Sequence, residues 1–347
     1  MKPYFETKLG KLYHGNALDV LKSLPDESVQ MCVTSPPYWG LRDYDNEPQI
    51  WNGEYGEYFN NKSWKCVHVW GDEYLNKKVS QGQFCQHCNA WKGSLGLEPT
   101  VELFIKHMII IFAEVKRVIR YDASLWLNLG DSMANKQIQG IPWRIALALQ
   151  ADGWYLRSDI IWHKPNPMPE SCTDRLTKAH EYLFLLTKSA QYYYDADAIR
   201  EPHKRLWKAN NGGSMSTERH HNAHIGGTNR HKRPYPEPNP SGRNKRTVWT
   251  IPTEPTPEAH FATFPEKLVE PCILAGSAKG GIVLDPFIGS GKTATVAMKH
   301  GRKFVGIELS KPYLDDIAIP KILEFITTEE RIERSEKGIT KKTGLLF

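Results

Sequence analysis

Residues 35–38 combine hydrogen-bond acceptors with an aromatic ring on a stiff piece of backbone. The four residues are Ser35, Pro36, Pro37 and Tyr38. A serine hydroxyl oxygen and the Pro36 carbonyl can both accept hydrogen bonds, and the Pro-Pro unit fixes that carbonyl in place. The tyrosine ring offers a face on which a planar group can stack. The tetrapeptide suits a flat ligand that carries an amino group, although a proline turn after a strand is also a common structural feature.

A second turn has the glycines of a nucleoside-binding loop. It consists of Asp285, Pro286, Phe287, Ile288, Gly289, Ser290, Gly291, Lys292 and Thr293. Glycines between a strand and a helix permit a tight turn and let a ligand approach the backbone. Glu308 ends the next expected strand, where a carboxylate can accept hydrogen bonds from both ribose hydroxyls. A phosphate-binding loop is one alternative, but Pro286 stands where that pattern requires glycine. A purely structural turn, the other alternative, leaves Asp285 and Glu308 unexplained.

Two short knuckles between residues 66 and 88 have the spacing of a zinc site. The four expected ligands are Cys66, His68, Cys85 and Cys88. The Cys-x-x-Cys spacing suits tetrahedral Zn²⁺, and a structural metal would supply folding energy to a segment that is poor in aliphatic residues. His87 competes with His68, but a residue inside such a knuckle usually points away from the metal. Free thiols are the alternative, and a redox role is disfavoured because no thioredoxin-like context surrounds the pair.

The positive charge of the chain is concentrated in one polar segment. The formal net charge is +6, and residues 201–247 contain ten Lys and Arg against three Glu, a local balance of +7. Such an excess favours contact with a polyanion, and a solvated loop is an equal alternative when the segment is taken alone.

The overall composition is that of a globular protein. The 347 residues are 40% hydrophobic and 24% charged, and six cysteines do not suggest a disulfide framework in a chain of this size. We find no apolar run of membrane-spanning length and no signal-peptide layout, so we expect a cytoplasmic protein without a membrane partner.

The chain alternates strand and helix patterns, which predicts a mostly parallel α/β sheet. Buried-strand patterns at 29–34 and 281–285 each lead directly into one of the two turns. Further strands are expected at 125–129, 156–162, 182–187 and 304–308, with helices at 17–24, 100–120, 142–152 and 292–300. Because two prolines cannot continue a central strand, residues 35–38 must lie beyond its carboxyl end, where open α/β sheets bind ligands.

Together, the two turns resemble motifs of the DNA amino-methyltransferases. Residues 285–293 look like the S-adenosylmethionine-binding motif of that family, residues 260–268 like the segment that precedes it, and residues 35–38 like its catalytic tetrapeptide. The order of the motifs matches the permuted β group, which implies a Rossmann-like sheet of the class I methyltransferase type. The resemblance covers about residues 11–314. A related family methylates protein glutamine through Asn-Pro-Pro-Tyr, and Ser35 and the basic segment argue against it.

The resemblance also implies the residues that bind S-adenosylmethionine. Phe264 and Pro265 would line the methionine side of the pocket, and Asp19 lies in a region similar to a further contact of the family. The implied cofactor-binding residues are Asp19, Phe264, Pro265, Asp285, Pro286, Phe287, Gly289, Ser290, Gly291, Thr293 and Glu308.

The implied reaction is methyl transfer to the exocyclic amine of a base in double-stranded DNA. The lone pair of such an amine is delocalised into the ring, and acceptors at Ser35 and Pro36 would draw electron density back onto nitrogen. The base must first leave the duplex, and Tyr38 would stack on it. No covalent adduct and no cysteine is needed. In this family, serine at the first position goes mainly with cytosine N4, which we expect here, and Asp or Asn with adenine N6, the alternative.

These expectations divide the chain into six segments. The α/β domain takes 1–42 and 97–195, a zinc-binding insertion 43–96, a target-recognition insertion 196–247, the cofactor-binding part 248–325 and a charged tail 326–347. The residues expected to contact DNA, mostly at phosphates, are Arg205, Lys208, Arg230, Lys232, Arg233, Arg243, Lys245 and Arg246. A homodimer and a cognate restriction endonuclease are compatible with this interpretation. A zinc-dependent nucleic-acid-binding protein without catalysis is the remaining alternative.

Overall fold

The computed structural model describes residues 1–41, 47–51, 68–72, 82–203, 239–254 and 264–328. The strands are β1 (Phe5–Thr7), β2 (Gly10–His14), β3 (Val29–Thr34), β4 (Gln49–Trp51), β5 (Gln83–Phe84), β6 (Trp91–Gly93), β7 (Ile119–Leu129), β8 (Met133–Ala134), β9 (Gln137–Ile138), β10 (Tyr155–His163), β11 (His180–Thr187), β12 (Val248–Thr250), β13 (Ile282–Asp285) and β14 (Lys303–Glu308). The helices are α1 (Ala17–Ser23), α2 (Val101–Val118), α3 (Ile141–Ala151), α4 (Glu266–Gly276), α5 (Lys292–Lys299) and α6 (Lys311–Tyr313), with a 3₁₀ turn at Asp197–Ile199 and a π-helical turn at Leu314–Ala318.

One nine-stranded sheet forms the middle of the protein, in the order β1-β2-β14-β13-β3-β7-β11-β10-β12. Strands β2, β14, β13, β3 and β7 run parallel to one another. Strand β11 runs antiparallel between β7 and β10, and β1 is an antiparallel edge strand. The expected mostly parallel α/β sheet is therefore confirmed, and strands from the end of the chain fill the space between strands from its beginning.

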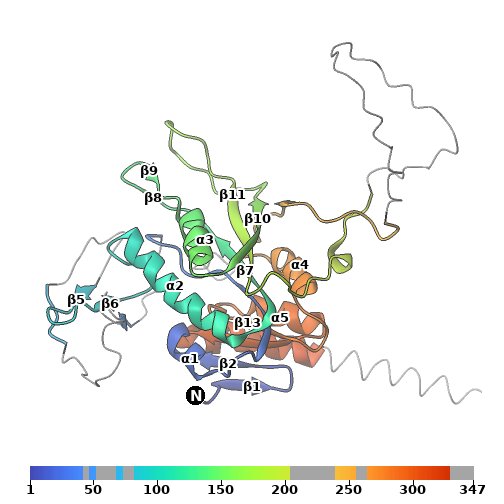
Figure 1. Ribbon diagram of the computed structural model, residues 1–347, viewed down its shortest axis with the longest axis horizontal. Coiled ribbons are helices and arrows are strands. Elements are labelled where there is room, and N and C mark those ends of the chain that lie inside the picture. Colours follow the sequence, from blue (N-terminus) through green and yellow to red (C-terminus); the bar gives the residue numbers. More distant parts are fainter. Residues whose placement is uncertain (42–46, 52–67, 73–81, 204–238, 255–263, 329–347) are drawn as a thin grey trace, which may run out of the picture.

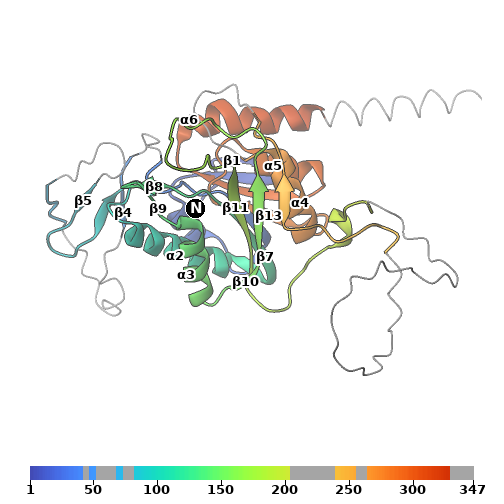
Figure 2. The ribbon, with the colours of Figure 1, turned by 90° about the horizontal axis from the view of Figure 1, so that it is seen from above.

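Helices cover both faces of this sheet because alternate strand residues point to opposite sides. In β3, Cys32 packs with α1, α2 and α3, whereas Met31 and Val33 pack with α4 and α5. Seen from above, α2 and α3 lie on one side of the strands and α4, α5 and α6 on the other (Figure 2). The result is a three-layer α/β/α arrangement with one hydrophobic core on each face of the sheet.

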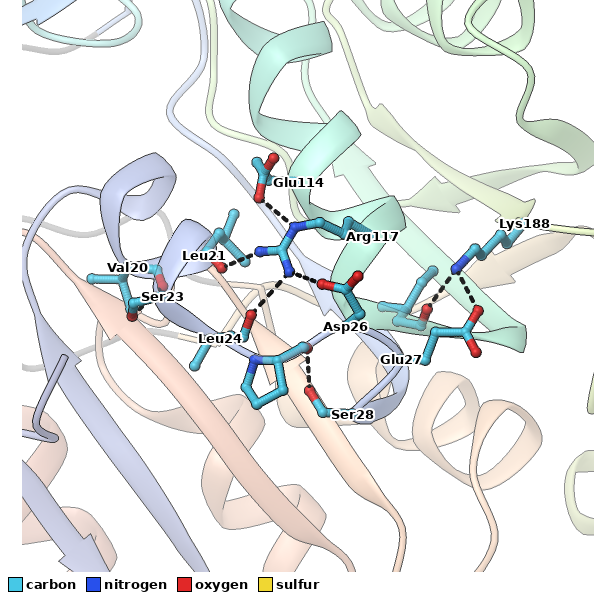
Figure 3. Close-up of polar contacts among 12 residues, drawn as sticks. Val20, Leu21, Ser23, Leu24, Asp26, Glu27, Ser28, Glu114, Arg117 and Lys188 are labelled. Carbon is cyan, nitrogen blue, oxygen red and sulfur yellow. Dashed lines mark hydrogen bonds and ion pairs between the residues drawn. The ribbon is translucent and has the colours of Figure 1, made fainter.

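Arg117, near the end of α2, clamps the connection from α1 to β3 (Figure 3). Its Nη2 donates to the carbonyl of Leu21 at 2.7 Å, and its Nη1 donates to the carbonyl of Leu24 at 3.0 Å and to Asp26. Its Nε donates to Glu114 at 2.8 Å. Carbonyls at the end of a helix lack partners within the helix, and the guanidinium supplies them. These contacts of Arg117 fix the position of the start of β3 and therefore the position of residues 35–38, which follow that strand.

A small three-stranded sheet, β4-β6-β5, packs beside α2 (Figure 1). Trp51 and Trp91 from this sheet stack on the ring of His107 in α2, with ring centroids 4.5 and 5.4 Å away. His107 Nδ1 lies 2.8 Å from a carboxylate oxygen of Glu98, and both side chains are buried. Burial raises the pKa of Glu98, and the His107 contact opposes that rise. This stack docks the described part of the 43–96 segment onto the body of the protein.

Within the residues that the structure describes, no helix has the length and apolar character needed to cross a bilayer.

Candidate active site

The two turns singled out in the sequence lie next to each other. Strands β3 and β13 pair in parallel, with Met31 opposite Val283 and Cys32 opposite Leu284. Their carboxyl ends therefore open at the same edge of the sheet, and residues 35–38 come next to residues 285–291 there. Thr34 also donates a hydrogen bond of 2.6 Å from Oγ1 to Asp285 Oδ1 and joins the two strand ends directly.

A cavity opens at these strand ends and contains about 1150 Å³ of empty space, including the part that is open to solvent. From the expected cofactor set it is lined by Phe264, Pro286, Phe287, Gly289, Ser290 and Glu308, and from the tetrapeptide by Ser35 and Pro37. The structure thus brings Ser35 and the acidic residue Glu308 to the wall of a single cavity.

Glu308, at the end of β14, is held in this wall by backbone donors. Its Oε2 accepts from the N–H of Gly289 at 3.0 Å and its Oε1 from the N–H of Ser310 at 2.8 Å. Burial raises the pKa of Glu308 to about 7, while these hydrogen bonds oppose the shift. The carboxylate is positioned to accept further hydrogen bonds from a ligand, as ribose hydroxyls would supply.

Asp285 lies beneath the glycine turn and does not line the cavity. Its Oδ2 accepts from Thr293 Oγ1 at 2.6 Å, and its Oδ1 accepts from Thr34 and from the N–H of Phe287 at 3.0 Å. Burial raises the pKa of Asp285 to about 6, although the hydroxyl donors lower it. These contacts indicate that Asp285 stabilises the conformation of the glycine turn.

Two glycines of the turn adopt the left-handed conformation, with φ of 49° at Gly289 and 79° at Gly291. A Cβ on Gly291 would also lie 3.2 Å from the Cα of Ala318. The next residue, Lys292, points its Nζ to Glu254 at 3.4 Å. A phosphate-binding loop uses this lysine to reach phosphate oxygens, so the ion pair and the nearby Glu308 both disfavour that alternative.

Several expected residues stand apart from the cavity wall. Asp19 lies on α1 outside the lining set, whereas Gly15, Asn16 and Ala17, just before it, line the cavity. The side chain of Asn16 caps α1 by accepting from the N–H of Leu18 at 2.7 Å. The remaining expected residues outside the lining set are Pro36, Tyr38, Pro265, Gly291 and Thr293, all of which adjoin residues that belong to it.

Tyr38 is held with its ring against the backbone of Gly130. A Cβ at Gly130 would lie 2.5 Å from Tyr38 Cε2, so the close approach requires glycine there. The Tyr38 hydroxyl oxygen lies 3.1 Å from Ser35 Oγ, 2.7 Å from Asn128 Nδ2 and 2.8 Å from Glu181 Oε2. Neither Asn128 nor Glu181 is among the site residues predicted from the sequence.

Residues of the 43–96 segment form a further part of the wall, which sequence reasoning missed. The cavity is also lined by Gln49, Trp51, Ser94 and Leu95, and by Leu97 just after the segment. The Asn16 side-chain amide donates to Gln49 and joins this part of the wall to the start of α1. No periodic pattern in the segment signalled this role.

Three of the four expected metal ligands lie together. The side-chain ligand atoms of His68, Cys85 and Cys88 are all within 4.8 Å of one another, and Cys66 lies outside the described residues. The cluster contains His68 rather than His87. Burial acts to raise the pKa of the Cys85 thiol, but hydrogen bonds from His68 and from backbone N–H groups lower it to about 5.

Three of the expected DNA-contacting residues can be placed. Arg243 and Arg246 pair with Glu201 at 3.0 and 3.3 Å, and the Nζ of Lys245 lies 4.7 Å from the ring centroid of Trp249. The five that lie outside the described residues are Arg205, Lys208, Arg230, Lys232 and Arg233.

Comparisons with known proteins show the family. The family model N6_N4_Mtase, described as DNA methylase, matches residues 29–319. The type II methyltransferase M.Cfr9I of Citrobacter freundii is 38% identical over 340 residues, which cover 90% of this chain and 87% of that protein. The type II methyltransferase M.SmaI of Serratia marcescens is 35% identical over 332 residues, covering 87% of each chain. The chain therefore belongs to the N6/N4 DNA methylase family and is an S-adenosylmethionine-dependent DNA methyltransferase.

Solved structures share the fold. The PvuII DNA methyltransferase, described as cytosine-N4-specific, superimposes with a TM-score of 0.58 at 17% identity and covers 93% of both chains. A putative DNA modification methylase from Thermus thermophilus, solved with S-adenosyl-L-methionine, gives a TM-score of 0.53 at 21% identity and covers 91% of this chain and 94% of that one. The Rossmann-like architecture expected from the sequence is thereby confirmed.

Proposed function

We propose that this protein methylates N4 of cytosine in double-stranded DNA, with S-adenosylmethionine as the methyl donor bound in the cavity at the ends of β3, β13 and β14. The observation that carries this proposal is the position of Ser35 in the same cavity wall as Glu308 and the glycine turn. A hydroxyl that accepts from an amine and a carboxylate that accepts from a ribose are thus within reach of one bound pair of substrates.

The donor chemistry of the cavity fits this cofactor. Glu308 offers a carboxylate to ribose hydroxyls, and the apolar side chains of Phe264 and Phe287 line the same space. When bound, S-adenosylmethionine supplies a positively charged sulfonium whose methyl group is open to in-line attack. The aromatic side chains of this wall suit such a cation.

Cytosine N4 is favoured over adenine N6 by the residue at position 35. Members of the family with serine first in the tetrapeptide act mainly on cytosine, and a protein described as cytosine-N4-specific shares the fold. Adenine N6 is the competing target on the same scaffold.

The deciding experiment identifies the methylated nucleoside. Duplex DNA is incubated with the purified protein and isotopically labelled S-adenosylmethionine, digested to nucleosides and analysed by mass spectrometry. We expect N4-methylcytosine; N6-methyladenine would show that the target assignment is wrong. Failure to bind S-adenosylmethionine by calorimetry would instead favour a DNA-binding protein without catalysis. Modified-base sequencing of DNA from expressing cells then gives the recognition sequence.

We also propose that His68, Cys85 and Cys88, with Cys66, hold a structural Zn²⁺. The Cys88 Sγ to His68 Nδ1 distance is 3.4 Å, and ligand atoms around a tetrahedral Zn²⁺ are separated by about 3.6 Å. Cys85 is buried and the turn that follows it is closed by the N–H of Asn89, which donates to the Cys85 carbonyl at 2.9 Å. The closeness of these three side chains supports the zinc proposal.

Metal analysis of the purified protein tests the zinc assignment. We expect about one zinc per chain and its loss in the double variant Cys85→Ser/Cys88→Ser. The matched control is Cys172→Ser, because Cys172 lies on the β10–β11 connection outside the cluster. Wild-type protein that is isolated without zinc from a zinc-supplemented culture would contradict the assignment.

We assign DNA recognition to the basic segment 196–247. The protein would act in the cytoplasm as the methyltransferase of a restriction-modification pair with a cognate restriction endonuclease. The names of both sequence relatives as type II methyltransferases support this. A homodimer is proposed with it, and light scattering of the free protein tests that proposal.

A further inference from the structure

The ends of four strands surround the Ser35 hydroxyl with one continuous chain of hydrogen bonds. Ser35 and Tyr38 follow β3, and Asn128 lies near the end of β7. Glu181 lies at the start of the antiparallel strand β11, and Lys164 follows β10. Because β11 runs against β7, its first residues come to the same edge of the sheet as the last residues of β3 and β7.

The direction of each hydrogen bond in this chain follows from the groups involved. A carboxylate can only accept, so the Tyr38 hydroxyl donates to Glu181 Oε2 at 2.8 Å. Asn128 Nδ2 lies 2.7 Å from the Tyr38 oxygen, 2.9 Å from Glu181 Oε2 and 3.4 Å from Ser35 Oγ, and its two hydrogens go to the two nearer acceptors. The Ser35 hydroxyl then donates to the Tyr38 oxygen at 3.1 Å. With its proton directed to Tyr38, the Ser35 oxygen presents lone pairs to an incoming amine.

Charged groups surround the far end of the chain. Lys164 Nζ donates to the other carboxylate oxygen of Glu181 and also lies 4.3 Å from the ring centroid of Trp162. Lys178, on the β10–β11 connection, and His180, the first residue of β11, also interact electrostatically with Glu181. The Glu181 side chain is 15% exposed. The chain of hydrogen bonds therefore ends at Glu181, an ion-paired acceptor that contacts solvent. Asn128, in the middle of the hydrogen-bond chain, is 2% exposed.

Methylation of an exocyclic amine leaves its nitrogen with one proton too many, and this proton needs an acceptor. We propose that Glu181 is that acceptor, reached through Ser35 and Tyr38. The nitrogen–carbon bond forms as the carbon–sulfur bond of the donor breaks, with the electron pair left on sulfur. The excess proton passes from nitrogen to Ser35 Oγ, the Ser35 proton passes to the Tyr38 oxygen, and the Tyr38 proton passes to Glu181 Oε2. The products are a neutral methylated amine and a protonated Glu181, which returns its proton to water.

This proton relay rests on the proposed function but not on the choice of base, because cytosine N4 and adenine N6 both lose a proton on methylation. It also gives Tyr38 a second role beside stacking. The ring packs on Gly130 while the hydroxyl occupies the middle of the relay.

The test uses the full-length protein with DNA in single-turnover reactions in ordinary and in heavy water. Glu181→Gln keeps the size and an acceptor oxygen but removes the base, and we expect the rate of methyl transfer to fall by about 100-fold. Because protons move along the relay, the wild-type rate should show a solvent deuterium isotope effect, and this effect should shrink in the variant. The matched control is Lys164→Met, which removes the ion pair but leaves the carboxylate and should keep the isotope effect.

Tyr38→Phe interrupts the same relay, so the double variant Glu181→Gln/Tyr38→Phe should be no slower than the slower single variant. Dissociation constants for S-adenosylmethionine and DNA should match wild type in each variant. The relay is overturned if Glu181→Gln retains the wild-type rate and solvent isotope effect, if the two defects multiply, or if lost binding accounts for the lost rate. A wild-type protein that methylates no base would overturn the proposed function as well.

Discussion

Thr34 and Asp285 are 251 residues apart in the chain and share a buried hydrogen bond of 2.6 Å from Oγ1 to Oδ1. One residue ends the strand before the tetrapeptide at 35–38, and the other ends the strand before the glycine turn. This bond therefore sets the distance between the two halves of the proposed reaction centre. Since Asp285 also holds Thr293 and the N–H of Phe287, its position controls both turns.

Replacing Thr34 with valine should destabilise the protein. The change preserves shape but leaves a buried carboxylate oxygen with one donor fewer, which costs about 1–3 kcal/mol. Urea unfolding measures this loss. Thr295→Val is the control, because the Thr295 hydroxyl donates to the carbonyl of Lys292, one turn back in its own helix, and its loss should have a much smaller effect. Equal losses of unfolding free energy in the two variants would show that the hydrogen bond between Thr34 and Asp285 contributes no more than a local hydrogen bond within a helix.

Gly130→Ala should slow methyl transfer by displacing Tyr38. The added Cβ would stand 2.5 Å from the tyrosine ring, so the ring must move from its hydrogen-bonded position. We expect turnover to fall by about tenfold or more with little change in affinity for S-adenosylmethionine, measured by single-turnover kinetics and calorimetry. In a Tyr38→Ala background the alanine side chain at position 130 has no tyrosine ring to displace. A further loss of turnover from Gly130→Ala in that background would contradict this explanation.

Binding of S-adenosylmethionine should weaken as pH falls below about 7. Burial raises the pKa of Glu308 to about 7, and a protonated Glu308 loses the charge that favours ribose hydroxyls. Calorimetry in buffers of different ionisation enthalpy should show proton release on binding near neutral pH. Glu308→Gln should bind more weakly, with a flat pH profile. A wild-type profile that is equally flat would mean that Glu308 does not contact the ligand.

The free protein should show the opposite dependence of stability on pH. The pKa values of Asp285 and Glu308 are raised to about 6 and about 7, so the folded state binds protons that the unfolded state has already released. The stability that these two groups contribute is thus present in acid and is lost as pH rises through their folded-state pKa values. Thermal unfolding without ligand should reveal a smaller decline in Glu308→Gln than in wild type over this interval. An identical decline in the two proteins would exclude Glu308 as a source of the effect.

Removal of the proposed zinc should loosen the cavity wall. The metal-ligand cluster closes a bend next to β5, and β6 carries Trp91, which stacks on His107 beside the lining residue Trp51. A chelator should lower the unfolding temperature and weaken S-adenosylmethionine binding, and added zinc should restore both. Unchanged binding in metal-free protein would separate the cluster from the cavity.

The part of the site that can be predicted from the sequence is the part fixed by strand ends. The strand patterns before Pro36 and before Pro286 are each local and strong, and parallel strands bring their carboxyl ends to one edge. These patterns place both turns at one edge of the sheet, whereas their direct contact depends on the adjacency of β3 and β13, which the strand patterns alone do not give.

The parts of the fold and site that the sequence did not predict depend on long-range packing, which leaves no local signal in the sequence. Glu181 reaches the site because β11 is antiparallel, and nothing in its own sequence indicates the direction of the strand. Trp51 and Leu95 line the cavity from a segment without periodicity. Helix α4 contains Pro271, which normally argues against a helix, and it is not among the predicted helices.

The place of β13 and β14 in the sheet has a consequence for synthesis of the protein. These two strands leave the ribosome after β10, β11 and β12, yet they occupy the gap between β2 and β3. Until residue 308 has emerged, β2 and β3 each face that gap with unpaired backbone groups, and the nascent polypeptide lacks Glu308. Translation must therefore pass residue 308 before the donor pocket exists, and a polypeptide terminated before that residue would be inert rather than partly active.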